Sequence, residues 1–245
     1  AKKVYLYDGN EALDVAAFRK QHQSLEAVEL ILETLPAEIE ATLDIAVLSP
    51  GVPLDIPVVE QMKAQGICIW GEIELAYVLG KGKVVAITGT NGKTTTTTLV
   101  GQIMARHFAK VQVVGNIGIP YTSVVEDTTE DTVVVAEISS FQLETIQTFA
   151  PKAAAILNIT PDHLNRHHTM ENYIAAKESI VKNQSKEDVC VLNYNDEVLR
   201  DFGKTLEQNV IYFSSTEVLE EGLYLDGNEI MWARNGGREA IISVE

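Results

Sequence analysis

The stretch Val84–Met104, VVAITGTNGKTTTTTLVGQIM, decides how the fold is interpreted. It predicts a buried strand, a tight glycine turn and a helix that begins at Lys93. A phosphate loop of the common form G-x-x-x-x-G-K-[ST] would need a glycine at position 87, where the chain has Ile87. What remains is the shorter pattern G-x-x-G-K-T, which runs from Gly89 to Thr94.

This shorter pattern keeps the groups that touch phosphate. Glycines at 89 and 92 tolerate positive φ, so successive backbone N–H groups can point at one anion. Lys93 supplies a positive charge, Thr94 supplies a hydroxyl for Mg²⁺, and the helix N-terminus adds its partial positive charge. An ordinary glycine turn is the alternative, but it does not explain why Gly, Lys and Thr fall in register. We therefore interpret the stretch as a phosphate loop.

Outward from this stretch, short apolar runs alternate with helical patterns, which is typical of a parallel sheet covered on both faces. Before it we expect strands at 2–8, 43–49 and 67–71, and helices at 21–35, 56–65 and within 71–83. After it we expect strands at 84–88, 111–115, 132–139, 153–160 and 188–193, and from residue 209 onward short strands with Gly/Asn turns. The predicted fold class is α/β: a truncated Rossmann-like N-terminal domain, then a P-loop central domain with a mostly parallel sheet and a small β-rich edge.

Glycines at 80 and 82 suggest a junction, so we expect a Rossmann-like domain at 1–81 and a P-loop domain at 82–245. The chain opens on VYLYDGN, which has the features of a second strand without the glycine-rich first βα unit. Its last residues, AIISVE, stop inside a predicted strand. We therefore expect that both ends are clipped.

Composition narrows the class of partner. The 245 residues carry a net charge of −16, which argues against nucleic acid and anionic membranes. Small phosphorylated ligands stay possible, because local N–H groups and one or two cations bind them. No apolar run is long enough to span a membrane, and the two cysteines lie far apart. A reduced, cytoplasmic protein is the simplest interpretation.

Two further segments place polar side chains after strands. VVVAEISSFQLE carries Glu137, which could hold Mg²⁺ or cap the next helix, and position alone does not separate these. AAAILNITPDHLNRHHTMENYIAAKESIVKNQ carries Asp162 and His163 in a polar loop and Lys177 on a helix. By position alone, a loop histidine is more often structural and a helix lysine is more often solvated.

Five motifs, GTNGKTT, GNIGIP, EISSFQLE, NITPDHLNRH and AAKESI, resemble in order and spacing those of the Mur ligase family. The short phosphate loop is the form found in that family. SSFQLE, with LSPGVP upstream, resembles the branch that adds D-glutamate to UDP-N-acetylmuramoyl-L-alanine. The resemblance implies a ligase of peptidoglycan precursor synthesis. ATP would phosphorylate the substrate carboxylate, and the amine of D-glutamate would displace the phosphate.

Other functions stay open beside this one. A nucleotide-binding fragment without ligase activity of its own fits the apparently clipped ends. A Mur ligase paralogue with another amino acid or a folate substrate is disfavoured by SSFQLE. A GTPase or kinase is disfavoured because no N-K-x-D motif is present.

The resemblance also implies roles for single residues. For ATP phosphates these are Asn91, Gly92, Lys93, Thr94 and Thr95. For Mg²⁺ two sites are implied, one at Thr94 and Glu137 and one at His163 and Lys177, with Lys177 carbamylated as in relatives. The implied catalytic residues are Lys93, His163 and Lys177. For the sugar-nucleotide substrate they are Asp8, Gly51, Asn116, Ser139 and Gln142. We expect a monomer that binds ATP, D-glutamate and UDP-N-acetylmuramoyl-L-alanine, with no nucleic-acid or membrane partner.

Overall fold

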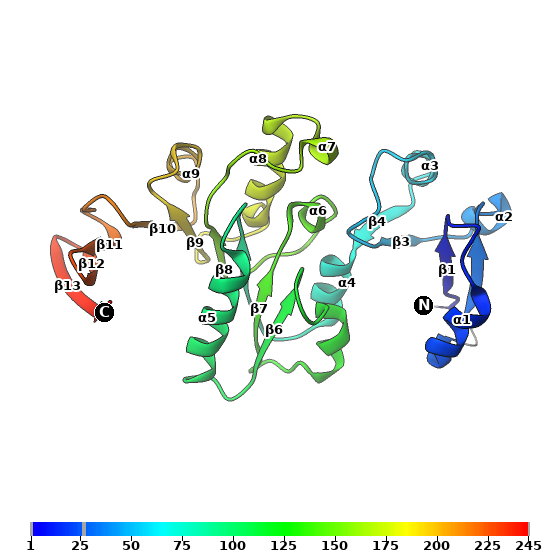
Figure 1. The fold of residues 1–245 in the computed structure, drawn as a ribbon, viewed down its shortest axis with the longest axis horizontal. Helices are drawn as coiled ribbons and strands as arrows, with labels where there is room; N and C mark the ends of the chain where they lie inside the picture. Colours follow the sequence, from blue (N-terminus) through cyan, green and yellow to red (C-terminus); the bar gives the residue numbers. More distant parts are fainter. Residues whose placement is uncertain (1, 26–27, 245) are drawn as a thin grey trace. The chain divides into compact units, whose positions relative to one another are not determined.

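The structure is a computed structural model that describes residues 2–25 and 28–244 (Figure 1). The chain divides into two compact units, each taken by itself below. One unit contains Ala1–Ala46 and Leu54–Ile69, and the other contains Val47–Pro53 and Trp70–Glu245.

The first unit contains short elements. Strands β1 (Tyr5–Asp8) and β2 (Glu29–Leu32) pair in parallel, with Tyr5 opposite Glu29. The helices of this unit are α1 (Val15–Gln21), η1 (Gln23–Leu25), α2 (Ala37–Glu40) and α3 (Pro57–Ala64). Strands β3 (Ile45–Leu48) and β4 (Cys68–Gly71), whose residues are divided between the two units, form a separate two-stranded sheet. The described strands before residue 72 thus form two small sheets in place of the single parallel sheet that was expected.

The helix predicted at 21–35 is wrong. The helix lies earlier, in α1, where the Asp14 side chain accepts the N–H of Ala17. The predicted range contains η1 and β2, and residues 26 and 27 lie outside the described residues. A short apolar run has the same pattern in a buried helix and a buried strand. Pairing with β1, which the local sequence does not encode, decides in favour of the strand.

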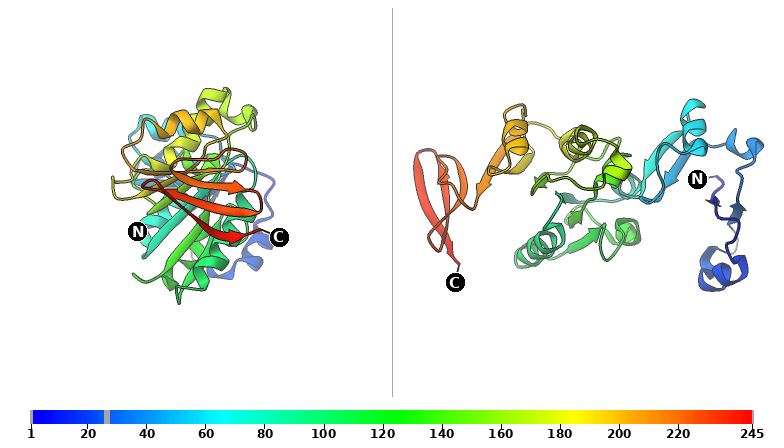
Figure 2. Two further views of the ribbon diagram at one scale, coloured as in Figure 1. Left: turned by 90° about the vertical axis from the view of Figure 1, so that its left-hand side faces the viewer. Right: turned by 45° about the horizontal axis from the view of Figure 1, so that its top comes forward.

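The second unit is built on one large sheet, whose described strands follow the order β13-β12-β11-β10-β9-β8-β5-β7-β6. Neighbours from β6 to β11 are parallel, and β11, β12 and β13 are joined antiparallel. In the left view of Figure 2 the last strands lie side by side in orange and red. The mostly parallel sheet with a β-rich edge is confirmed.

The strands of this sheet are β5 (Lys83–Thr88), β6 (Val111–Gly115), β7 (Val133–Glu137), β8 (Ala153–Ile156), β9 (Val189–Asn193), β10 (Asn209–Ser214), β11 (Gly222–Asp226), β12 (Glu229–Arg234) and β13 (Gly237–Ser243). The helices of the unit are α4 (Glu72–Leu79), α5 (Lys93–Ala105), η2 (Tyr121–Asp127), α6 (Ser140–Leu143), α7 (Leu164–His167), α8 (Met170–Glu178), η3 (Ser179–Val181) and α9 (Glu197–Gly203).

Alternate residues of the central strands pack on opposite faces of the sheet. On one face Ile87, Val133 and Val135 pack with Val100 and Met104 of α5. The core of the other face combines residues of β5, β7, β8 and β9 with residues of α4, η2, α6, α8, η3 and α9. Because helices cover both faces of the sheet, polar side chains that could bind a ligand are expected at the ends of the strands.

Two carboxylates of helix α4 accept hydrogen bonds from other segments of this unit. Glu74 is fully buried and accepts the backbone N–H groups of Gln147, Thr148 and Phe149 at 2.9, 2.7 and 3.1 Å. It also accepts the Thr148 hydroxyl at 2.6 Å. Glu72 accepts the N–H and hydroxyl of Thr122. The division into domains at residues 81 and 82 stays a prediction.

Candidate active site

Most of the predicted site residues lie at the carboxyl ends of four neighbouring strands, β8, β5, β7 and β6. From β5 the chain runs to β6, returns to β7 and then crosses to β8 on the other side of β5. Such a change of direction leaves a crevice at the carboxyl ends of a parallel sheet, where ligands bind. The predicted phosphate loop follows β5, at the centre of this region.

The residue that replaces the expected early glycine still belongs to the sheet. Ile87 pairs with Glu137 of β7 and Ala155 of β8, and its side chain is 1% exposed in the core. An extended, buried position favours a large β-branched residue and has no use for glycine. The loop therefore begins two residues later, at Gly89, and is shorter for that reason.

The loop has the backbone shape that its glycines predict. Gly89 and Gly92 have φ values of 150° and 81°, in the region that side chains disfavour. Gly92 is the N-cap of α5, no side chain caps this end, and the helix begins at Lys93 as predicted. The first N–H groups of a helix have no partner within it, so they are available to an anion.

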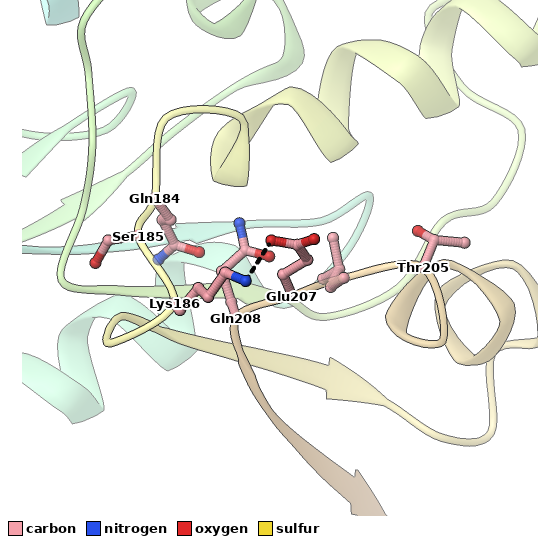
Figure 3. Close-up of a pocket in the computed structure, with 7 residues that line it drawn as sticks. Gln184, Ser185, Lys186, Thr205, Glu207 and Gln208 are labelled. Carbon is pink, nitrogen blue, oxygen red and sulfur yellow. Dashed lines mark ion pairs between the residues drawn. The ribbon is translucent and has the colours of Figure 1, made fainter.

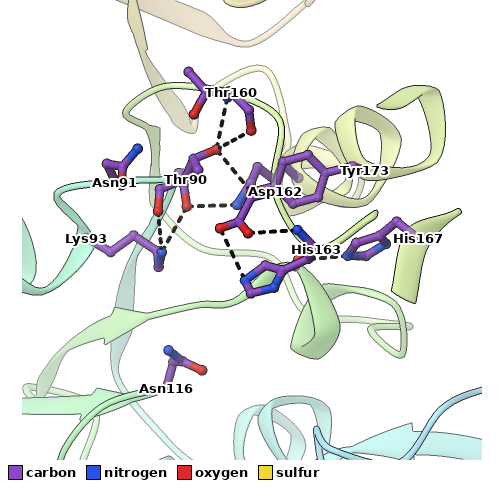
Figure 4. A network of polar contacts seen from close by, with 12 residues as sticks. Thr90, Asn91, Lys93, Asn116, Thr160, Asp162, His163, His167 and Tyr173 are labelled. Carbon is purple, nitrogen blue, oxygen red and sulfur yellow. Dashed lines mark hydrogen bonds and ion pairs between the residues drawn. The ribbon is translucent and has the colours of Figure 1, made fainter. Parts of the chain in front are cut away.

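Two lysines meet at this loop. The ammonium of Lys93 donates to the carbonyl oxygens of Gly89 and Thr90, both at 3.0 Å (Figure 4). The ammonium of Lys177 donates to the same Gly89 oxygen at 2.8 Å and lies 4.7 Å from the centre of the Tyr173 ring. Lys177 is only 2% exposed, so the alternative of a solvated helix lysine is wrong. Burial, helped by the charge of Lys93, lowers the pKa of Lys177 to about 7.

Glu137 ends β7 and is buried, and the amide of Asn116 donates to its Oε1 at 3.0 Å. Glu137 does not cap the following helix. Ser139 and Gln142 do so in a reciprocal capping box, with distances of 3.2 Å to Ser139 Oγ and 2.9 Å to Gln142 Oε1. The capping alternative for Glu137 is therefore wrong. Substrate contact by Ser139 and Gln142 stays a prediction.

His163 precedes α7 in a left-handed conformation, with φ of 52°. This conformation strains the backbone of a non-glycine residue, and such strain often occurs at functional positions. Its backbone N–H donates to Asp162 Oδ1 at 2.8 Å, and its Nε2 lies 3.5 Å from Asp162 Oδ2. The imidazole is half-exposed and lies beside the Phe141 ring, with 5.0 Å between ring centres.

Two residues of α7, Arg166 and His167, form polar contacts with residues outside the helix. Arg166 donates to Glu144 Oε2 at 2.6 Å and to the Val52 carbonyl at 2.9 Å. His167 is buried, with Nδ1 3.3 Å from Glu144 Oε1 and Nε2 2.9 Å from the Ser140 hydroxyl. Burial lowers the pKa of His167 despite the nearby Glu144. A neutral ring that donates from Nδ1 and accepts at Nε2 satisfies both contacts. His167 is thus a structural residue, as expected for a histidine here.

The other predicted residues lie as follows. Thr94 and Thr95 are exposed in the first turn of α5. Gly51 is exposed in the loop after β3. Asp8 belongs to the other unit, at the end of β1, where it accepts the N–H of Asn10 at 2.9 Å.

Comparison with known proteins identifies the family. Residues 87–234 match the Mur ligase middle domain. This chain belongs to the Mur ligase family. The match covers more than half of the chain and includes the loop, Glu137, His163 and Lys177.

Curated relatives within the Mur ligase family point to one branch. The UDP-N-acetylmuramoylalanine–D-glutamate ligase of Lachnoclostridium phytofermentans is 53% identical over 240 residues, which is 98% of this chain and 53% of the relative. The ligase of the same name from Clostridioides difficile is 50% identical over 210 residues, 85% of this chain and 46% of the relative. The chain spans about half the length of the curated relatives it matches.

Solved Mur ligase structures share the fold. One is the UDP-N-acetylmuramate:L-alanyl-gamma-D-glutamyl-meso-diaminopimelate ligase from Neisseria meningitides, with a TM-score of 0.56 and 17% identity. The similarity covers 95% of this chain and 76% of that one. At this identity, the likeness supports the fold and not the substrate.

Sequence reasoning missed several residues of this candidate site, above all Thr90, Asn158 and Tyr173. The Thr90 hydroxyl lies 3.0 Å from the Tyr173 hydroxyl, and Asn158 bonds to the backbone of the phosphate loop. A signal for Asn158 was available, because it follows β8 at the same sheet edge that pointed to Glu137. Thr90 and Tyr173 gave no such signal.

Three further features of the described residues lie outside this site or are absent from it. No group of three or more His, Cys, Asp or Glu side chains in this part of the chain is arranged to hold a metal ion. None of the helices found there has the length and apolar character needed to cross a bilayer. A surface hollow of about 500 Å³ lies between residues 184–186 and 205–208, with an exposed ion pair of Lys186 and Glu207 at 3.0 Å (Figure 3). It contains none of the predicted site residues.

Proposed function

We propose that this chain is the nucleotide-binding part of a Mur ligase that uses ATP to join D-glutamate to UDP-N-acetylmuramoyl-L-alanine. The observation that carries the proposal is the meeting of Lys93 and Lys177 at the Gly89 carbonyl, beside the strand that ends at Glu137. The relatives at 50% identity or more are named for this reaction. ATP would phosphorylate the substrate carboxylate, and the amine of D-glutamate would then displace phosphate from the acyl phosphate.

The phosphate loop supplies the ATP-binding groups in this proposal. Asn91, Gly92, Lys93, Thr94 and Thr95 would hold the phosphates. Lys93 now donates to two carbonyl oxygens of its own loop, so its ammonium is already held over the turn. When phosphate binds, the ammonium exchanges these neutral acceptors for charged ones, which form stronger hydrogen bonds.

The two proposed Mg²⁺ sites differ in how well their side chains suit this ion. Thr94 and Glu137 offer hydroxyl and carboxylate oxygens, the ligands that Mg²⁺ prefers. Glu137 is buried, and its carboxylate accepts a hydrogen bond from Asn116 at the sheet edge that the loop occupies. Mg²⁺ would supply charge stabilisation for the transferring phosphoryl group. His163 and Lys177 offer nitrogen, so a second site would need an added oxygen ligand.

Carbamylation of Lys177 would provide that oxygen. Only the neutral amine reacts with carbon dioxide, and a pKa of about 7 leaves much of Lys177 neutral near neutral pH. In the full chain, Lys177→Ala should lose ligase activity and regain part of it with added short-chain carboxylate. An alanine variant with wild-type activity would remove Lys177 from the mechanism.

The remaining assignments complete the proposal. Asp8, Gly51, Asn116, Ser139 and Gln142 would face the sugar-nucleotide substrate. Residues 1–81 would form the domain that binds it, and residues 82–245 the domain that binds ATP. We propose a cytoplasmic monomer without a nucleic-acid or membrane partner.

The decisive experiment is phosphate release from Mg-ATP in the presence of UDP-N-acetylmuramoyl-L-alanine, with and without D-glutamate. Release that depends on D-glutamate would establish the ligase. The chain covers about half of its relatives, so the same assay on a longer form separates the alternative, a nucleotide-binding fragment without activity of its own. If that longer form is active only with another amino acid, the protein is a paralogue.

A further inference from the structure

The side-chain amide of Asn158 forms hydrogen bonds with the backbone of the phosphate loop through both its oxygen and its nitrogen. Its Oδ1 accepts the N–H of Asn91 at 2.8 Å, and its Nδ2 donates to the carbonyl of Asn91 at 3.0 Å. The backbone carbonyl of Asn158 accepts the N–H of Thr90 at 2.9 Å. One residue thus satisfies three backbone groups at the tip of the loop.

The residues next to Asn158 in the chain also contact the phosphate loop. The Thr90 hydroxyl accepts the N–H of Thr160 at 3.0 Å and lies 3.2 Å from its carbonyl oxygen (Figure 4). Leu157 packs under Gly89, where an added Cβ would lie 3.0 Å from the Leu157 Cβ. Residues 157–160 therefore follow the phosphate loop along its length, and Asp162 and His163 come directly after them.

These contacts decide which N–H groups of the loop remain for an anion. The N–H groups of Thr90 and Asn91 are both donated to Asn158, so neither is free for phosphate in this arrangement. Phosphate is left with the N–H groups from Gly92 onward, at the start of α5, with the side chain of Asn91 and with the ammonium of Lys93. The peptide of Asn91 must be held in one orientation for those groups to converge.

We propose that Asn158 is a positioning residue that holds the phosphate loop in its phosphate-binding shape and ties it to the segment carrying Asp162 and His163. The inference rests on the proposed function, because it assumes that the loop binds ATP. Asn158 acts through the backbone of Asn91 and does not itself touch the nucleotide. Losing the side chain frees the Asn91 peptide to rotate, and the ordering of the loop must then be supplied by the nucleotide at the cost of affinity.

The chain offers a matched control in Asn193. It ends the neighbouring strand β9, donates from Nδ2 to the Leu157 carbonyl at 3.0 Å and accepts the N–H of Asn195 at 3.0 Å. Its pattern of one donated and one accepted backbone hydrogen bond matches that of the Asn158 side chain. Neither bond reaches residues 89–92, so Asn193→Ala reports the general cost of such a loss.

The test compares Asn158→Ala and Asn193→Ala in the full chain, using calorimetric affinity for Mg-ATP and amide hydrogen exchange without nucleotide. Asn158→Ala should weaken Mg-ATP binding by about ten-fold or more and release the Asn91 N–H to faster exchange, while Asn193→Ala stays within about two-fold of the wild type. Thermal unfolding shows whether the two variants lose similar stability, so that the difference in affinity is not a difference in folding.

A folded Asn158→Ala variant that binds Mg-ATP like the wild type overturns the inference. If this variant does not fold, Asn158→Ser takes its place, since a serine hydroxyl cannot reach both backbone groups of Asn91. It should weaken binding by about three-fold or more, and wild-type affinity would again overturn the inference. A wild-type chain that does not bind Mg-ATP would refute the proposed function, and the role of Asn158 with it. Binding by both the wild type and Asn158→Ala refutes the positioning role alone.

Discussion

The ammonium groups of Lys93 and Lys177 donate to one acceptor, the carbonyl oxygen of Gly89, at 3.0 and 2.8 Å. Lys93 begins α5 directly after the loop, whereas Lys177 lies 88 residues beyond Gly89 on α8. Burial, helped by the positive charge of Lys93, lowers the pKa of Lys177 to about 7, since two positive charges at one carbonyl repel each other. An anion bound at the loop would relieve this repulsion.

Lys93→Ala should abolish detectable Mg-ATP binding, because it removes the charge that the loop holds in place for phosphate. Isothermal titration calorimetry of the full chain measures this. The control is Lys83→Ala, which removes an exposed lysine at the start of β5, the end of that strand away from the loop, and should leave binding unchanged. Unchanged affinity in Lys93→Ala would mean that the loop is not the phosphate site.

The buried Lys177 should make the folded state more stable as the pH rises. Its folded pKa of about 7 lies below the ordinary value of 10.5, so between these values the unfolded chain binds more protons. The free energy of unfolding therefore rises with pH across this window. Below a pH of about 7, Lys177 is charged in both states, and the free energy of unfolding is reduced by the full cost of burying that charge.

Lys177→Met keeps the bulk of the side chain and removes the titration. Urea unfolding at about pH 6.5 and about pH 9 should show the wild type gaining stability relative to this variant at the higher pH. The comparison cancels the titration of other groups common to both proteins. An equal difference at the two pH values would show that Lys177 does not titrate in this range.

Glu74 should contribute to stability and not to nucleotide binding. Glu74→Ala removes a fully buried carboxylate and leaves the N–H groups of Gln147, Thr148 and Phe149 without their acceptor. We expect a loss of about 3 kcal/mol in the free energy of unfolding. Chemical denaturation measures it, with Glu130→Ala as an exposed control. A loss no larger than that of the control would mean that water replaces the carboxylate.

Arg166→Met should destabilise the chain by removing one partner of a largely buried ion pair. Glu144 would lose its partner at 2.6 Å, and the Val52 carbonyl would lose its donor. The side chains are 12% and 16% exposed, so we expect about 2 kcal/mol, less than for a fully buried pair. A double-mutant cycle with Glu144→Gln isolates the interaction. Additive losses would show that the two charges are not coupled.

Much of the fold could be predicted from local pattern. The parallel strands were found because β-branched apolar runs alternate with helical segments, and the start of α5 was found from its glycines and Lys93. The helix predicted at 21–35 failed because the run that forms β2 is too short for its period to separate helix from strand. Only pairing with β1 separates them, and that is a contact between distant segments.

The sequence by itself determined the phosphate loop, since φ, charge and hydroxyl are properties of Gly89, Gly92, Lys93 and Thr94 within a few residues of chain. It also carried the motifs of the family. Tertiary structure alone decided what surrounds the loop. Burial changed Lys177 from a surface cation into an amine of pKa about 7, and the neighbouring strand brought Asn158 against the Asn91 peptide. Burial and strand order depend on segments more than 60 residues apart, and so no local pattern encodes them.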